Sequence, residues 1–238
     1  MGTREDELSP VRVKKVKNIV AVAGDDHTLA VKENGRVLSW GANSGGKLGD
    51  GTTTGRMEPV KIDGLYDVVA VGAGNFFSTA LLSDGTVSAW GANDYGELGD
   101  GTRDDHRTPM PVPGFDGVAA MDSGAGHTLA IRTDGRLWAW GFNETGQLGL
   151  GTFEQDALSP TQVVGLVDVV SAGAGSNHSV AALADGTAWG FGWNQYGQLG
   201  DGQEPPRDDE AFPVQVVAPE GPLLVSAGSV HSMGVAAG

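Results

Sequence analysis

The chain has 238 residues, enough for one large domain or two small ones. Its formal net charge of −15 makes nucleic acid and anionic membranes poor partners, because their phosphate groups would be repelled. The absence of cysteine excludes a disulfide framework, a thiolate zinc site and a cysteine nucleophile. In chain order, residues 1–9 form a charged tail without an apolar run, so we expect no signal peptide, no membrane span and a cytoplasmic location.

Five similar units follow the tail, and a proline opens each of them. The step from proline to proline is 49 to 53 residues. Four markers recur in register: a Gly-x-x-His block, an aromatic residue followed by glycine, an asparagine three residues later, and Leu-Gly. The second unit carries Phe77 at the histidine position. We therefore divide residues 10–238, taken as one domain, into units 10–58, 59–108, 109–159, 160–212 and a partial 213–238.

Each complete unit predicts four short strands. The first follows the proline, as in residues 60–62, and the second is small and apolar, as in residues 68–71. The third starts at the histidine and alternates, as in residues 27–31, and the fourth ends at the aromatic-glycine pair, as in residues 36–41. An Asn-Gly or Asp-Gly pair between the last two strands predicts a tight primed turn, in which both central residues have positive φ. No segment shows helical periodicity.

Both faces of the predicted strands are apolar or small. His27, Leu29 and Val31 of one third strand face one way. Thr28 and Ala30 face the other way. A sheet buried on two sides needs a neighbour on each side, and radially arranged four-stranded sheets supply one. We therefore predict an all-β fold, a β-propeller of four complete units plus a partial fifth, in which the aromatic ring of one blade packs where the next blade has only a glycine.

Two stretches show the motif in full: HTLAVKENGRVLSWGANSGGKLGDGT and HTLAIRTDGRLWAWGFNETGQLGLGT. The motif resembles the regulator of chromosome condensation repeat, and the resemblance extends from about Pro10 to the end of the chain. It implies a propeller with blades of about fifty residues, commonly seven of them. This chain predicts 19 strands, one short of five blades. It therefore forms a small ring, an open arc whose edges pair with another chain, or a fragment of a longer propeller.

The recurring polar residues are interpreted as structural. Repeats spread the histidines around an axis, too far apart for one metal, and each can hydrogen-bond neighbouring backbone. Residues 41–48 match the phosphate-binding loop motif at all but its last position, where Leu48 replaces the Ser or Thr that binds magnesium. We therefore expect no metal, no cofactor and no catalytic residue from these motifs. One aspartate in each of three units is interpreted as a turn cap: Asp50, Asp100 and Asp201.

The variable segments between Leu-Gly and the next proline are the candidates for binding, because equivalent loops of a repeat array lie on one face. Their charged candidates are Arg103, Asp104, Asp105, His106, Arg107, Glu154, Asp156, Arg207, Asp208, Asp209 and Glu210. Three tryptophans depart from the repeat and are further candidates, since tryptophan is enriched at binding hot spots: Trp138, Trp189 and Trp193. Solvated loops and a larger blade core are the alternative interpretations.

The leading functional hypothesis is a non-enzymatic scaffold that recognises a protein partner through the variable loops, with self-association through open sheet edges as a further prediction. Three alternatives stay open. The resemblance implies nucleotide exchange on a small GTPase, to which acidic loops could contribute. Inhibition of another enzyme would use aromatic-rich loops that include Tyr95 and Tyr196. An enzyme would use loop carboxylates around a central pocket.

Overall fold

The computed structural model describes residues 9, 11–14, 16–204, 208–217 and 221–236. Within these ranges the chain forms eighteen β-strands and one three-residue 3-10 helix, η1 (Ser44–Gly46). The strands make four antiparallel sheets of four strands and one sheet of two. No helix in this part of the chain has the length and apolar character needed to cross a membrane. The predicted all-β architecture is confirmed.

The sheets, here called blades, follow one another along the chain. Blade 1 contains β1 (Ile19–Gly24), β2 (His27–Lys32), β3 (Val37–Gly41) and β4 (Arg56–Lys61). Blade 2 contains β5 (Val68–Ala73), β6 (Phe77–Leu82), β7 (Val87–Gly91) and β8 (His106–Pro111). Blade 3 contains β9 (Val118–Ser123), β10 (His127–Arg132), β11 (Leu137–Gly141) and β12 (Ala157–Gln162). Blade 4 contains β13 (Val169–Ala174), β14 (His178–Leu183), β15 (Ala188–Gly192) and β16 (Glu210–Gln215), and the last sheet contains β17 (Pro222–Ala227) and β18 (Ser232–Ala236).

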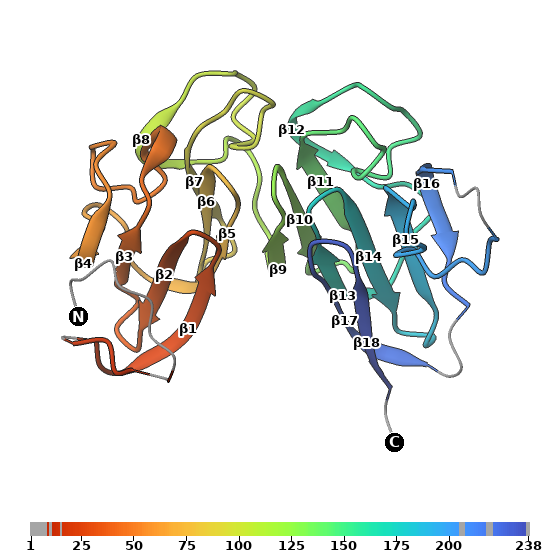
Figure 1. Ribbon diagram of the computed structural model, residues 1–238, viewed down its shortest axis with the longest axis horizontal. Coiled ribbons are helices and arrows are strands. Elements are labelled where there is room, and N and C mark those ends of the chain that lie inside the picture. The colour runs from red at the N-terminus through yellow and green to blue at the C-terminus, as the bar shows by residue number, and fades with distance from the viewer. Residues whose placement is uncertain (1–8, 10, 15, 205–207, 218–220, 237–238) are drawn as a thin grey trace.

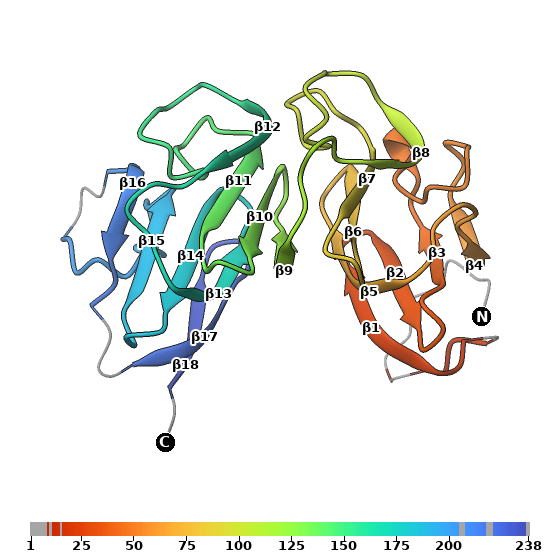
Figure 2. The same ribbon diagram turned by 180° about the vertical axis from the view of Figure 1, so that it is seen from behind.

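The first strands of successive blades lie beside one another, as a propeller requires. β1 contacts β5, β5 contacts β9, β9 contacts β13, and β13 contacts β17. Blade 1 and the β17–β18 hairpin lie at the two ends of this row, and the views from both sides show the arc open between them (Figures 1 and 2). The described residues therefore form an open arc and not the small closed ring, which was one of the three expected outcomes.

The sheets are shifted by one strand relative to the units counted from each proline. Pro59 lies in β4, which pairs with β3 of the unit before it. The same holds for β8, β12 and β16. The strand expected directly after Pro10 does not form within residues 11–14 and 16–18, and Pro10 itself lies outside the described residues. A strand rich in apolar residues can pair on either side, so the sequence pattern alone does not choose its sheet.

The hairpin turn between the second and third strands differs from the predicted primed turn. Gly35 has a φ of 70°, but Asn34 is not among the residues with positive φ. The Gly35 amide donates to the Lys32 carbonyl at 2.8 Å, and the Lys32 amide donates to the Arg36 carbonyl at 2.9 Å. The turn is therefore the three-residue kind with a glycine bulge. The Asn34 side chain accepts a bond from the Arg36 amide, which stabilises this shape.

The core is divided into three hydrophobic clusters, and each lies at the junction of two successive blades. At the first junction Trp90 of blade 2 is fully buried, and its indole N–H donates to the Lys47 carbonyl of blade 1 at 2.8 Å. A Cβ on Gly49 would lie 2.8 Å from that indole nitrogen. Trp140 on Gly99 and Phe191 on Gly149 repeat the arrangement. The predicted ring-on-glycine packing is confirmed, except that the glycine belongs to the preceding blade.

Candidate functional site

The variable segments all leave the sheets at the same end, which we call the loop face. They connect β3 to β4, β7 to β8, β11 to β12 and β15 to β16. In Figure 1 the segments of blades 2 and 3 form the upper edge of the molecule. The hairpins from the first to the second strand of each blade end at the same face, because Phe77 at the start of β6 pairs with Gly91 at the end of β7.

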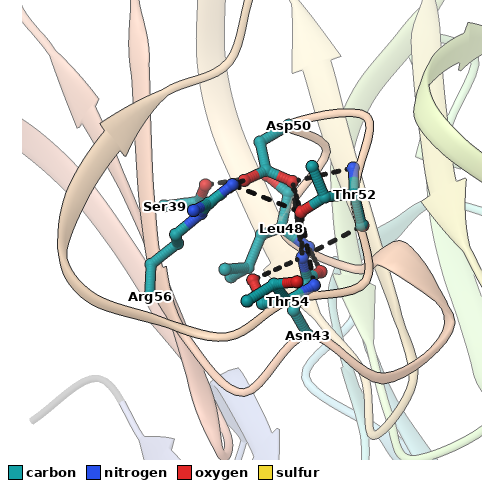
Figure 3. Close-up of polar contacts among 7 residues, drawn as sticks. All are labelled: Ser39, Asn43, Leu48, Asp50, Thr52, Thr54 and Arg56. Carbon is teal, nitrogen blue, oxygen red and sulfur yellow. Dashed lines mark hydrogen bonds and ion pairs between the residues drawn. The ribbon is translucent and has the colours of Figure 1, made fainter.

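A buried asparagine holds each variable segment in shape, and Figure 3 shows the one in blade 1. In blade 1 the Oδ1 atom of Asn43 accepts the Leu48 amide at 2.9 Å. Its Nδ2 atom donates to the carbonyls of Thr52 and Thr54, both at 3.0 Å. The side chain is only 3% exposed. One side-chain amide therefore bonds the backbone of both the first and the second half of the loop, which fixes the loop conformation and so the positions of its surface residues.

Asp50 supports the same loop from its outer side. It accepts bonds from the Thr52 amide at 3.0 Å and from the Thr52 hydroxyl at 2.7 Å, and it forms an ion pair with Arg56 at 2.6 Å. Partial burial raises the pKa of Asp50, but the bonds from Thr52 and Arg56 outweigh this effect and the pKa lies below its usual value. Asp100 and Asp201 accept the amide two residues later in the same way, which confirms the predicted turn caps.

The other blades repeat the asparagine contacts. Each asparagine accepts the amide of the leucine five residues later, at 2.9 to 3.2 Å. None of their side chains is exposed: Asn93, Asn143 and Asn194. The asparagines recur visibly in the sequence, but their structural role was not predicted. The signal in the sequence was the fixed spacing, because an asparagine side chain five residues before the leucine can bond the backbone of its own loop.

Several of the charged candidates are engaged in holding the loops. Asp105, Asp156 and Asp209 each accept the backbone amide of the loop asparagine of their own blade, at 3.0 to 3.1 Å. Asp156 also pairs with Arg103 of the preceding blade at 3.0 Å. Carboxylates with such bonds are poorly placed to act as an acid or base, which weakens the loop-carboxylate enzyme hypothesis.

The remaining charged candidates are distributed over the loop face. His106 contacts Asp100 at 3.0 Å, and Arg107 is exposed. Burial and the neighbouring carboxylates of Asp201 and Asp208 raise the pKa of Glu210. Three acidic candidates, like Arg107, have exposed side chains and stay available to a partner: Asp104, Glu154 and Asp208. Arg207 lies outside the described residues.

The three tryptophan candidates are not brought together. Trp138 packs beside one core cluster, with 5.5 Å between the centres of its ring and that of Phe115, which it meets edge-on. Trp189 packs against another cluster, and its indole N–H donates to the Thr187 hydroxyl at 3.1 Å. Both are half-buried in their blades, as the interpretation of a larger blade core expects. Trp193 alone of the three lies at the loop face, where its ring is 5.3 Å from that of Tyr196.

The recurring histidines connect neighbouring blades. The Nε2 atom of His127 lies 2.9 Å from the Ser179 hydroxyl of the next blade, and that hydroxyl donates to the Gln147 carbonyl at 2.7 Å. His27 and His178 contact serines of their next blades in the same way. The structural role is therefore confirmed, with a serine hydroxyl as the partner instead of neighbouring backbone. Within the described residues, no group of three or more His, Asp or Glu side chains is arranged to hold a metal.

A row of buried polar residues precedes each Leu-Gly pair: Lys47, Glu97, Gln147 and Gln198. The ammonium group of Lys47 contacts Asp26 and the Asn75 carbonyl, each at 2.5 Å. These contacts agree with the interpretation that residues 41–48 are not a phosphate loop. The Glu97 carboxylate accepts the Tyr95 amide at 2.8 Å. Burial, with smaller contributions from Asp94 and Asp156, raises the pKa of Glu97 to about 7.

Replacing Glu97 by the glutamine of blades 3 and 4 is expected to stabilise the fold at pH 8. An unfolded glutamate ionises near pH 4.5, whereas the folded carboxyl has a pKa of about 7 and resists ionisation. The free energy of unfolding therefore falls as pH rises from about 4.5 to about 7. Glu97→Gln removes this loss and should raise the free energy of unfolding at pH 8 by about 1–3 kcal/mol. Urea unfolding at pH 8 and pH 4 measures the effect. An equal gain in stability at pH 8 and at pH 4 would show that ionisation of Glu97 is not the cause.

Aromatic rings that are exposed or half-buried gather on the loop face. Tyr95 of blade 2 and Phe142 of blade 3 lie 4.7 Å apart between ring centres. Trp193 and Tyr196 make a second pair on blade 4, and Phe76 is 53% exposed in the β5–β6 turn. The scaffold does not require these rings, because blade 1 has Gly45 at the Tyr95 position and blades 1 and 2 have alanine at the Phe142 position: Ala42 and Ala92.

Comparison with known proteins agrees with this architecture. Residues 1–181 match the family model described as RCC1-like domain, and residues 185–235 match the model of the regulator of chromosome condensation (RCC1) repeat. A second RCC1 repeat model matches residues 169–198. The chain belongs to the RCC1 repeat family. The resemblance and the propeller predicted from the motif are thereby confirmed.

Individual members of the RCC1 repeat family are similar over different lengths. The ultraviolet-B receptor UVR8 of Arabidopsis thaliana is 33% identical over 98% of this chain, and the human E3 ubiquitin-protein ligase HERC2 is 43% identical over 32% of it. Human WBSCR16 and yeast Prp20p each superpose with a TM-score of 0.83 at 25% identity, over 93% and 94% of this chain. The chain spans 55% of UVR8, 2% of HERC2, 59% of WBSCR16 and 57% of Prp20p.

Proposed function

We propose that this chain is a non-enzymatic protein-binding module whose loop face recognises a positively charged protein surface. The observation that carries the proposal is the pair formed by the exposed ring of Tyr95 and the half-buried ring of Phe142, at positions where other blades have glycine or alanine. Large rings at a rigid surface contribute strongly to protein interfaces. Protein binding is also what is described for Prp20p, with Gsp1p and histones as its partners.

The preferred charge of the partner follows from the residues around the rings. Four acidic side chains are exposed in the variable segments of blades 2 and 3, which also carry Tyr95 and Phe142: Asp94, Asp104, Glu144 and Glu154. The chain as a whole has a net charge of −15. A basic partner is therefore attracted at long range, and its affinity is expected to fall as salt rises, because salt screens exposed charges.

Affinity capture with matched variants tests the proposal. The double variant Tyr95→Thr and Phe142→Ala carries residues that other blades have at these positions, so the fold is retained. We expect it to lose partners captured by the unaltered chain, with affinities weakened roughly tenfold or more. The control variant, Val164→Thr and Val167→Thr, changes exposed side chains at the end of blade 4 opposite the loop face. It should still capture the same partners as the unaltered chain. Equal capture by all three proteins would overturn the proposal.

Nucleotide exchange on a small GTPase is the second candidate. It is favoured by the likeness to Prp20p, for which binding to Gsp1p is described, and by the exposed carboxylates of the loop face. Release of a fluorescent guanine nucleotide from a small GTPase would measure it, and a rate equal to the spontaneous one would exclude it. Inhibition of another enzyme would use the same rings and would respond to the same double variant.

A further inference from the structure

Glu97 is a buried carboxyl group at a position where the other complete blades have no acid. The residue before Leu-Gly is Lys47 in blade 1, Glu97 in blade 2 and glutamine in blades 3 and 4. Glu97 is only 5% exposed. Its Oε2 atom accepts the Tyr95 amide at 2.8 Å, and its backbone carbonyl accepts the indole N–H of Trp140 at 3.0 Å. The carboxyl group therefore lies next to the backbone of the residue that carries the exposed Tyr95 ring.

The structural role of this position does not need a charge. Gln198 of blade 4 accepts the Tyr196 amide at 3.0 Å, just as Glu97 accepts the Tyr95 amide. An acid at the same place lowers the stability of the fold when it ionises, because burial disfavours the charged form. A buried ionisable group that costs stability, where a neutral residue could replace it, is typical of a functional position. In blade 2 that position adjoins the ring on which the proposed function rests.

The groups around Glu97 leave its negative charge uncompensated. After the larger effect of burial, the neighbouring carboxylates of Asp94 and Asp156 also raise the pKa of Glu97. Arg103 is already engaged with the Asp94 carbonyl and with the Asp156 carboxylate, the latter at 3.0 Å. Within the described residues, no cationic side chain forms an ion pair with Glu97. A cation that arrives from outside would therefore favour the ionised form of Glu97.

We propose that Glu97 couples the binding of a basic partner at the loop face to the release of a proton. When a lysine or arginine side chain of the partner docks beside the exposed ring of Tyr95, the Glu97 carboxyl group loses its proton to the solvent. The resulting carboxylate attracts the bound cation, so the partner binds more tightly as pH rises. The inference rests on the proposed function, and it adds the pH range in which the loop face binds its partner best.

The expected pH range follows from the surroundings of Glu97. Burial raises its pKa in the free chain to about 7. A unit positive charge held roughly 10 Å away in protein surroundings changes the ionisation constant of a carboxyl group about tenfold. By linkage, the affinity for the partner rises most steeply over roughly one pH unit below pH 7 and is nearly constant outside that interval. Lysine and arginine of the partner stay charged throughout, so their own titration does not contribute.

Calorimetric titration of the full chain with a basic peptide tests the inference. The probe is a synthetic peptide of alternating glycine and arginine with blocked ends, used at low salt. We expect about fivefold tighter binding at pH 8 than at pH 6, and release of about 0.4 proton per complex at pH 7. The proton release is measured by comparing binding enthalpies in buffers of different ionisation enthalpy. Glu97→Gln, which copies blades 3 and 4, should bind equally at both pH values and release no proton.

Two further variants separate the contribution of Glu97 from those of its neighbours. The double variant Tyr95→Thr and Phe142→Ala should bind the peptide weakly at every pH. His106→Gln removes the histidine of the same variable segment, which contacts Asp100 at 3.0 Å, and should keep the pH dependence. Circular dichroism confirms that each variant is folded.

The possible outcomes distinguish this inference from the proposed function. Peptide binding that needs the two rings but releases no proton would overturn the inference and leave the proposed function unaffected. The same holds for a proton release that persists in Glu97→Gln or disappears in His106→Gln. Absence of saturable peptide binding, or undiminished binding by the double variant, would overturn both.

Discussion

Acidification from pH 7 to pH 4 is expected to lower the free energy of unfolding by at least about 3 kcal/mol, because three buried histidines must remain neutral in the folded state. Burial lowers the pKa of His127 to about 3, and burial lowers those of His27 and His178 to about 4. An unfolded histidine takes up a proton near pH 6.5. Stability is therefore present above pH 6.5 and is lost as pH falls toward the folded pKa values.

The geometry of His127 explains the direction of its shift. The Ser179 hydroxyl uses its one hydrogen on the Gln147 carbonyl, so it can only accept a bond from the Nε2 atom of His127. The neutral ring therefore carries its hydrogen on Nε2. A second proton would go to Nδ1, which is buried without a hydrogen-bond partner. An imidazolium there would be desolvated and unpaired.

The second blade provides a matched control for the pH effect. Phe77 stands at the histidine position, and the next blade has Thr128 where the other junctions have serine. The double variant His127→Phe and Ser179→Thr copies this natural pair and should reduce the loss of stability between pH 6.5 and pH 4. Urea unfolding curves across this range measure it. An unchanged pH slope in the double variant would show that other groups cause the acid sensitivity.

Replacement of Trp140 by alanine is expected to cost about 3–5 kcal/mol of stability. Its ring is fully buried at the junction of blades 2 and 3, and its indole donates to the Glu97 carbonyl at 3.0 Å. The ring also packs on Gly99. Its removal opens a cavity between two sheets and leaves the Glu97 carbonyl without this donor. The cost comes from the interface between blades, so unfolding of both neighbours should be affected.

Trp138 in the same strand is the control. It is half-buried, and blade 1 has Leu38 at its position. Trp138→Leu should therefore cost less than about 1.5 kcal/mol. Denaturant unfolding monitored by circular dichroism compares the two variants. Equal losses for Trp138→Leu and Trp140→Ala would mean that burial at the blade junction is not what distinguishes the two rings.

Strand positions and repeat markers could be predicted well, since alternation and turn residues are local properties. The strands expected at residues 27–31, 36–41 and 68–71 form within one or two residues of those limits. The candidate site was predicted less well. Asp105, Asp156 and Asp209 looked like free loop charges, but they accept backbone amides that the chain brings to them only after folding. Sequence distance does not reveal such contacts.

The repeat, the four strands of each unit and the pairing of a large ring with a glycine could be predicted from the residues, because these features depend on residue type and spacing. Which strand joins which sheet became clear from the folded chain alone, since the strand at Pro59 pairs with the blade before it. The fold also brings His127 to Ser179 and Trp140 to the Glu97 carbonyl. Both are properties of neighbouring blades, and no single unit contains the atoms on both sides of a junction.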